Sequence, residues 1–204
     1  MMTAKAPGAL VTALLMLSLP GCGSFEKEAA KQQRYMLETT RSGEQQSTSK
    51  HVLEVRTFNV SAAFAANSFV YRNKGGEYSS DFYNEFFVSP GVIMANNSRD
   101  WMRRSGMFAT VRSGGSRMTA THVLEGDVTE LYGDYSKTPA EAVIKIHVVL
   151  LDGSDDSLLI DREYSLSEQV TDDLPGSLVG AWNRALGTLL GRLENDLKLS
   201  LNKS

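Results

Sequence analysis

Residues 142–166 read AVIKIHVVLLDGSDDSLLIDREYSL, and this stretch decides the fold. Its first ten residues are apolar except for Lys145 and His147, which is typical of a strand inside a sheet. The next six residues, DGSDDS, have the composition of a turn, and residues 158–166 then form a returning strand. The stretch therefore predicts two paired strands, the first of them central in a sheet.

The residues after these two strands predict a long helix from Asp173 to about Leu199. Apolar residues recur there with the period of a helix that buries one face. They are Leu178, Trp182, Ala185, Leu186, Leu189, Leu190, Leu193 and Leu197. Four glycines (176, 180, 187 and 191) weaken this helix in isolation, so packing must stabilise it. We expect the glycines to let the helix lie close to a sheet.

Further strands and a shorter helix are predicted upstream. The strands are runs of β-branched and aromatic residues at 52–60, 69–71, 78–87, 107–111 and 122–132. The helix begins at Ser89-Pro90, with serine as the cap, and ends at Ser105-Gly106. This order of elements predicts an α+β fold, in which a mainly antiparallel or mixed sheet is covered on one face by two helices.

The chain starts with MMTAKAPGALVTALLMLSLPGC, in which residues 9–19 form an apolar run. The run is too short to cross a bilayer but suits a secretory signal peptide. Leu19-Pro20-Gly21-Cys22 resembles a bacterial lipobox, whose cysteine receives a diacylglyceryl group and an acyl chain such as palmitate. Two or more acyl chains give stable membrane binding. The alternatives are a signal peptide with a chance cysteine, or a buried N-terminal helix.

Cleavage before Cys22 divides the chain into three parts. Residues 1–21 are the signal peptide, residues 22–50 are the lipidated N-terminus with a tether and a short first strand at Tyr35-Met36-Leu37, and residues 51–204 are the α+β domain. The polar run from Ser42 to Lys50 predicts a flexible loop. Since Gly23 is not an aspartate that would retain the protein in the inner membrane, we expect an anchor in the outer membrane on its periplasmic face.

Composition and motifs exclude several classes of function. The 204 residues carry a net charge of −3, without the basic excess of a nucleic-acid-binding protein. A single cysteine forms no intramolecular disulfide and no cysteine-cluster zinc site. The three histidines (His51, His122 and His147) lack metal-ligand spacing, and no nucleophile elbow or phosphate-binding loop is present. We therefore predict no catalytic residue, no metal and no cofactor beyond the lipid on Cys22.

Six short motifs follow one another along the mature chain. They are Tyr35-Met36-Leu37, Val70-Tyr71-Arg72, the aromatic run from Tyr78 to Phe87 before Pro90, Ser105-Gly106-Met107-Phe108-Ala109-Thr110-Val111, Leu124-Glu125-Gly126-Asp127-Val128 and Ala181-Trp182-Asn183-Arg184-Ala185-Leu186-Gly187. Together they resemble the ABC-type transport auxiliary lipoprotein family. One departure is that Phe86-Phe87-Val88-Ser89 replaces a tryptophan-containing stretch that is common in the family.

This resemblance implies a non-enzymatic, membrane-anchored lipoprotein that is the auxiliary component of a lipid transport system between membranes. Its implied partners are the membrane, MCE-type proteins and ABC transporter proteins, and the resemblance also allows a homo-oligomer. Two alternatives remain open. One is a periplasmic lipid carrier, which needs a closed apolar cavity between sheet and helices. The other is a general outer-membrane structural lipoprotein.

The aromatic run offers a candidate partner surface. Strand alternation places Tyr83 and Phe87 on one face and Phe82 and Phe86 on the other, so we assign the second pair to the core. Tyr71 joins the first pair as a candidate contact for a partner or a lipid. The plainer interpretation of all these residues is half core and half ordinary strand surface.

Overall fold

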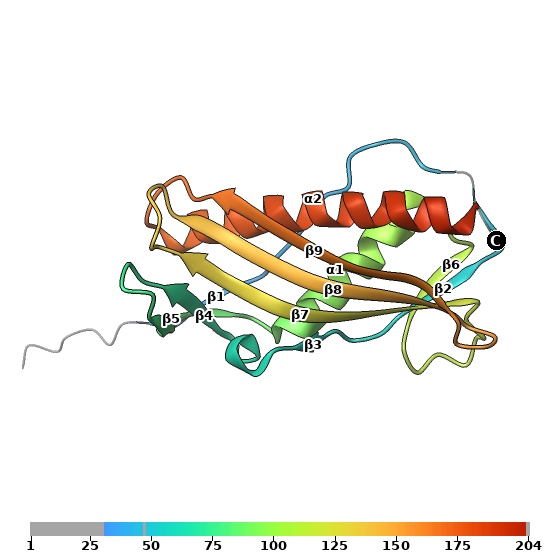
Figure 1. The fold of residues 1–204 in the computed structure, drawn as a ribbon, viewed down its shortest axis with the longest axis horizontal. Coiled ribbons are helices and arrows are strands. Elements are labelled where there is room, and N and C mark those ends of the chain that lie inside the picture. Colours follow the sequence, from blue (N-terminus) through green and yellow to red (C-terminus); the bar gives the residue numbers. More distant parts are fainter. Residues whose placement is uncertain (1–30, 47, 203–204) are drawn as a thin grey trace, which may run out of the picture. The chain divides into compact units, whose positions relative to one another are not determined.

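The computed structural model describes residues 31–46 and 48–202. The predicted signal peptide, the lipobox and Cys22 lie outside the described residues. Within them the chain forms one mixed sheet of nine strands, with two helices on one face (Figure 1). The predicted α+β fold class is therefore confirmed.

The sheet is built around β7 (His122–Asp134), its longest strand. On one side β7 pairs antiparallel with β8 (Glu141–Asp152), which pairs antiparallel with β9 (Leu158–Gln169). On the other side, successive parts of β7 pair in parallel with three short strands, β2 (Val52–Val55), β3 (Asn59–Val60) and β4 (Ser68–Arg72). The stretch 142–166 thus forms the predicted strands, with one of them beside the centre of the sheet.

Three more strands extend the sheet beyond these short strands. At one end, β6 (Thr110–Ser113) pairs in parallel with β2. At the other end, β5 (Tyr78–Phe86) pairs antiparallel with β4, and β1 (Gln33–Tyr35) pairs in parallel with β5. A 3-10 turn, η1 (Ala62–Phe64), lies between β3 and β4. Strand β1 is therefore an edge strand at the β4–β5 end of the domain.

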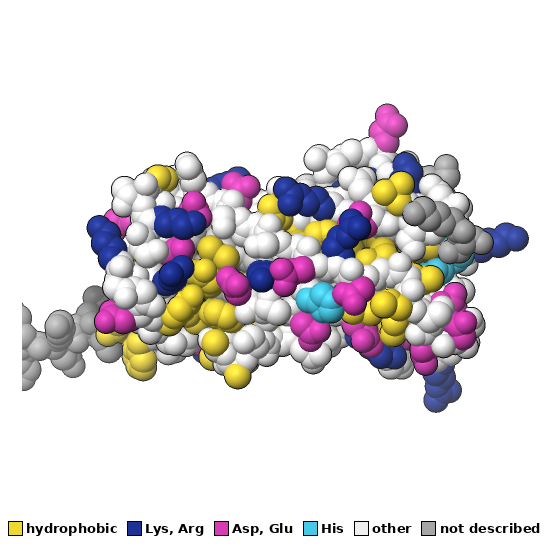
Figure 2. Space-filling view, viewed as in Figure 1, with side chains coloured by type: hydrophobic (Ala, Val, Ile, Leu, Met, Phe, Trp, Pro, Cys, Tyr) yellow, Lys and Arg dark blue, Asp and Glu magenta, His cyan; other side chains and the backbone are white. Residues whose placement is uncertain are grey.

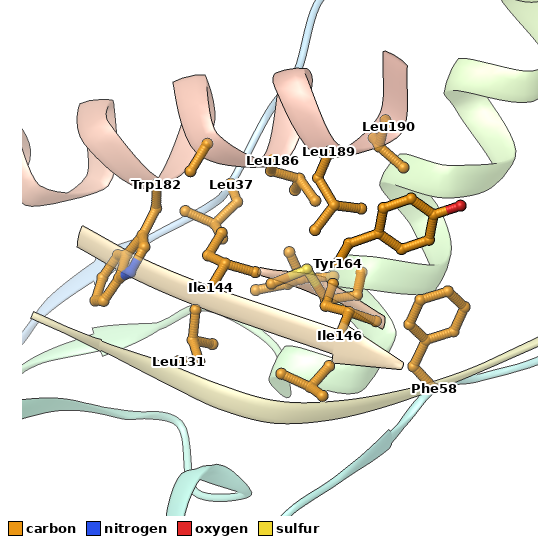
Figure 3. Close-up of a cluster of buried hydrophobic side chains, with 14 of the residues drawn as sticks. Leu37, Phe58, Leu131, Ile144, Ile146, Tyr164, Trp182, Leu186, Leu189 and Leu190 are labelled. Carbon is orange, nitrogen blue, oxygen red and sulfur yellow. The ribbon is translucent and has the colours of Figure 1, made fainter. Parts of the chain in front are cut away.

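The core lies between the sheet and α2 (Pro175–Leu201) (Figure 3). Alternate residues of β8, among them Ile144 and Ile146, are buried under this helix, whereas Lys145 and His147 lie on the open face. All eight predicted apolar positions of α2 are buried. The prediction that the glycines of α2 face the sheet was wrong. Cβ atoms at Gly187 and Gly191 would meet the side chain of Trp101, which belongs to the shorter helix.

The shorter helix is α1 (Pro90–Ser105), at the predicted position. Pro90 is its first residue, but the Ser89 side chain accepts no capping hydrogen bond from the backbone of the first turn. Gly106 ends the helix with a φ of 70°, a left-handed conformation that glycine adopts without a steric cost. Among the described residues, neither helix is long and apolar enough to cross a membrane.

Two predicted strands are shifted along the chain. The first strand ends at Tyr35, and Leu37 instead enters the core with 1% of its surface exposed. The strand predicted at 107–111 begins at Thr110, because Met107 and Phe108 are buried in the connection before it. In both cases an apolar side chain packs in the core from a segment without ladder hydrogen bonds.

The described residues between Met36 and Lys50 form no helix or strand, yet they are held against the domain. The Arg41 guanidinium donates to both Glu194 oxygens, at 2.8 and 2.9 Å, and both side chains are buried. The backbone N–H of Gln46 donates to the backbone carbonyl of Ser105 at 2.6 Å. The compact unit thus begins at Lys31, and the described residues of the predicted tether, 31–46 and 48–50, belong to it.

Candidate functional site

The β4–β5 end of the domain carries the predicted surface residues Tyr71, Tyr83 and Phe87. Tyr71 lies in β4 and is half-buried, whereas Tyr83 and Phe87 are 47% and 60% exposed. Phe82 is 74% exposed and Met36 is 38% exposed. We call Met36, Phe82, Tyr83 and Phe87 the aromatic edge. Figure 2 shows hydrophobic side chains gathering at this end of the open face, over β4 and β5.

Asp81 organises this end of the domain. One of its oxygens accepts the Tyr71 hydroxyl at 2.6 Å and the Asn84 side-chain amide at 2.8 Å. The other accepts the backbone amides of Tyr83 at 2.7 Å and Asn84 at 3.0 Å. The Asp81 carboxylate therefore joins Tyr71 to the backbone on which Tyr83 lies.

These hydrogen bonds stabilise an irregularity in β5. Ser68 pairs with Glu85 and Val70 with Ser80, so a single residue of β4 lies opposite residues 81–84 of β5. A bulge of this kind interrupts the alternation of side chains along a strand. The assignment of Phe82 to the core was therefore wrong, since Phe82 points to solvent. Phe86 lies beyond the bulge and is buried, as predicted.

The electrostatics of the cluster favour a fixed structure. Burial alone would raise the pKa of the Asp81 carboxyl, but its hydrogen bonds with Tyr71, Asn84 and the backbone lower the pKa below the usual value. Burial, together with the Asp81 carboxylate, raises the pKa of the Tyr71 hydroxyl. Tyr71 thus keeps its proton and Asp81 its charge at neutral pH. Both groups are occupied with each other, which suits a structural role better than proton transfer.

Phe87 and Met36 lie where β5 and β1 end together. The Phe87 amide donates to the Tyr35 carbonyl at 2.8 Å and continues the pairing of the two strands. Arg34 and Glu85 are paired across these strands and form an ion pair at 2.7 Å. Alternation places Phe87 on the same face as Glu85, away from the core that contains Tyr35 and Phe86.

A shallow groove adjoins this cluster. It has a volume of about 380 Å³ and is lined by Tyr71, Asn73, Asp81, Tyr135, Asp173 and Pro175. The rings of Tyr71 and Tyr135 meet edge to face, with 5.5 Å between their centroids. Burial, and then the carboxylates of Asp173 and Asp172, raise the pKa of Tyr135. The groove therefore presents protonated phenols beside carboxylates.

The other candidate residues are scattered. His51 and His122 meet edge to face at 4.6 Å, while His147 lies on the open face with its Nε2 2.5 Å from an Asp161 oxygen. Among residues 31–46 and 48–202, no three metal-ligating side chains come together. In the layer between sheet and helices, buried hydrophobic side chains form one cluster (Figure 3).

Sequence reasoning missed Asp81 and Met36. In the strand predicted at 78–87, Asp81 is only one of the alternating positions, and nothing in a single sequence marks a bulge of this length. Met36 was included in the first strand, although that strand ends one residue earlier. An aspartate followed by Phe82-Tyr83-Asn84 offered a weak signal, because aspartate side chains often bind backbone amides two or three residues ahead.

Comparisons with known proteins show the fold. No protein-family model matches the chain, and no curated protein matches it. Protein XCC0632 from Xanthomonas campestris, of the family DUF330, has a similar structure, with a TM-score of 0.68 at 16% identity over 78% of this chain and 95% of that one. A further uncharacterised protein matches with a TM-score of 0.62 at 16% identity, over 76% of this chain and 99% of that one.

A more distant likeness is the hypothetical protein CT253 from Chlamydia trachomatis. Its TM-score is 0.53 at 9% identity, over 72% of this chain and 96% of that one. These three structures share the arrangement of sheet and helices with this chain. At such identities the likeness extends to the fold alone.

Proposed function

We propose that this chain is a non-enzymatic lipoprotein, anchored by lipid on Cys22, that serves as an auxiliary component of an ABC/MCE-type lipid transport system. The observation that carries the proposal is Leu19-Pro20-Gly21-Cys22 at the end of an apolar run of signal-peptide length. Cys22 is the only cysteine and lies nine residues before Lys31, where the compact unit begins. A thiol in that place is suited to carry an anchor for the domain.

The resemblance to the auxiliary lipoprotein family supports the transport role. In the structure, Gly126 of the Leu-Glu-Gly motif lies against the ring of Phe58, where a Cβ atom would come within 2.5 Å of that ring. Trp182 of the Ala-Trp-Asn motif is fully buried against Phe69 and Phe86. These motifs therefore act in packing, and the proposed partners would be recognised elsewhere, on the exposed surface.

Mass spectrometry of the protein expressed in a Gram-negative host tests the anchor. We expect the wild type to begin at Cys22 and to carry diacylglyceryl and acyl groups, and Cys22→Ala to carry neither and to leave the membrane fraction. Ser24→Ala is the matched control, since it alters a neighbouring polar residue and keeps the cysteine. An unmodified cysteine in the wild type contradicts the proposal.

Purification from native membranes tests the transport role. We expect the tagged wild type to co-purify with an MCE-type protein or with the permease and ATPase of a transporter. The Cys22→Ala variant, which keeps the folded domain, separates contacts of the domain from contacts through the shared membrane. A lipidated protein that carries no transport partner contradicts the auxiliary role while leaving the anchor intact.

Replacement of the residue after Cys22 tests the location. We expect the wild type in outer-membrane fractions and Gly23→Asp in inner-membrane fractions, because aspartate at that position is the retention signal that Gly23 lacks. Gly23→Ala is the control and stays with the wild type. If the wild type itself is found in the inner membrane, the proposed location is wrong.

A further inference from the structure

The aromatic edge has no cover in the described domain. Phe82, Tyr83 and Phe87 are each about half exposed or more, and the rings of Phe82 and Tyr83 meet edge to face, with 5.2 Å between their centroids. The Asp81 hydrogen bonds keep the bulge in this conformation. Large side chains that a fold holds in solvent mark a surface for a further contact.

The chain that leads to Cys22 joins the domain at this same place. The Gln32 side chain donates to the Phe82 carbonyl at 3.3 Å, so the second described residue lies beside the bulge. Lys31 follows Cys22 by nine residues, which span at most about 30 Å when fully extended. A lipid anchor on Cys22 therefore keeps this end of the domain within about 30 Å of the anchor.

The chemistry of the aromatic edge suits a bilayer interface. Aromatic side chains with a polar tip concentrate at the level of the lipid headgroups, and apolar side chains bury there with them. The two charges of Arg34 and Glu85 are paired at 2.7 Å, and the Asp81 carboxylate has its own donors. These three charged groups therefore already have partners when the edge approaches the lipid.

We propose that the aromatic edge inserts into the headgroup region of the bilayer that holds the Cys22 anchor, and so fixes the orientation of the domain on the membrane. This inference rests on the proposed lipid anchor. Of the two contacts open to the candidate surface of Tyr83 and Phe87, a partner or a lipid, this inference chooses the lipid. It also includes Phe82 and Met36 in that surface. Tyr71 takes part only indirectly, by holding Asp81 and with it the bulge.

Single-cysteine labelling tests the insertion on the full lipoprotein. Because the chain's own cysteine is acylated, Phe82→Cys and Phe87→Cys each supply the sole free thiol for an environment-sensitive fluorophore. Leu158→Cys is the matched control, as Leu158 is 58% exposed and begins β9 at the opposite end of the sheet (Figure 1). The variants are purified with their lipid and reconstituted into vesicles of phosphatidylethanolamine and phosphatidylglycerol.

We expect the emission of labels at 82 and 87 to shift to the blue and to be quenched by brominated acyl chains, whereas the label at 158 keeps its aqueous spectrum. Labels at 82 and 87 that stay aqueous on a chain with acylated Cys22 overturn the insertion and leave the anchor standing; they point to a protein partner for the edge. A chain without lipid on Cys22, seen by mass spectrometry, overturns both proposals. Equal quenching at all three positions overturns a fixed orientation.

Discussion

Two carboxylates in the domain are surrounded by hydrogen-bond donors, and they hold very different regions. Glu194 of α2 is buried and accepts from Arg41 and from the Trp101 indole at 2.7 Å. It ties the N-terminal segment to both helices. Asp81 lies at the rim of the sheet, and its donors are Tyr71, Asn84 and the backbone. It holds a bulge that keeps aromatic side chains in solvent.

The difference shows that a hydrogen-bonded carboxylate stabilises the core in one region and holds exposed side chains in place in the other. In both cases hydrogen bonds outweigh burial and lower the pKa of the carboxyl group. Around Glu194 the donors are themselves buried, so losing one leaves an uncompensated charge in the core. Around Asp81 water can replace a lost donor. Substitutions should therefore cost much more in the first region than in the second.

The largest effect is expected for Arg41→Ala. It leaves the buried Glu194 carboxylate without its cation, and we expect unfolding free energy to fall by about 3–5 kcal/mol. Urea unfolding followed by the fluorescence of the buried Trp101 and Trp182 measures this. Arg162→Ala is the matched control. It breaks an ion pair with Asp196, which lies on α2 as Glu194 does, but the Arg162 side chain is 56% exposed. There we expect about 1 kcal/mol or less.

Equal losses for Arg41→Ala and Arg162→Ala would show that the buried and the exposed ion pair contribute equally to stability. A double variant tests the reason for the expected difference. Replacing both partners, as Arg41→Met with Glu194→Leu, should recover much of the loss, because no charge is then left buried.

The next effect contrasts two phenylalanines of one strand. Phe86 is 2% exposed and packs on Phe69 at 4.7 Å, so Phe86→Ala should cost about 3–5 kcal/mol. Phe82→Ala removes a side chain that contacts chiefly Tyr83 and should change stability by about 0.5 kcal/mol or less. The same urea experiment measures both. A large loss for Phe82→Ala would show that Phe82 packs in the core and that the bulge is not as described.

These two residues also show what a single sequence can and cannot predict. The strands at 142–166 and the apolar stripe of α2 follow from periodicity, which neighbouring residues specify. The Asp81 bulge does not, because alternation assumes an unbroken ladder, and the pairing of β5 with β4 is interrupted at residues 81–84. The Glu194 cluster is equally hidden, since Arg41 lies 153 positions away in a segment whose polar composition indicates a loop. At Glu194 prediction fails because the partner lies far along the chain, whereas at Asp81 it fails because the pairing of two strands is irregular.

A smaller effect is expected at Asp81. Asp81→Ala leaves the Tyr71 hydroxyl and two backbone amides to water, which should cost about 1–3 kcal/mol. Tyr71→Phe removes only the hydroxyl and should cost less. Since the folded-state pKa of Asp81 is depressed, its stabilising effect is present above the unfolded pKa and is lost as the pH falls through the folded value. The unfolding midpoint of Asp81→Ala should therefore converge with that of the wild type in acid.

The smallest effect separates two histidines by the sign of their pH dependence. Burial, and then His51, lower the pKa of His122 below 6.5, so its neutral form stabilises the fold above that pH and the benefit is lost in acid. The hydrogen bond to Asp161, with Asp127 also near, raises the pKa of His147, so its benefit is present below 6.5 and is lost as the pH rises through the folded value. Comparing urea midpoints at pH 5.5 and 8, we expect His122→Gln to reduce the loss of stability in acid and His147→Gln to increase it. The opposite signs follow because burial favours the uncharged ring of His122, whereas Asp161 favours the charged ring of His147. Changes of the same sign for the two variants would contradict this difference.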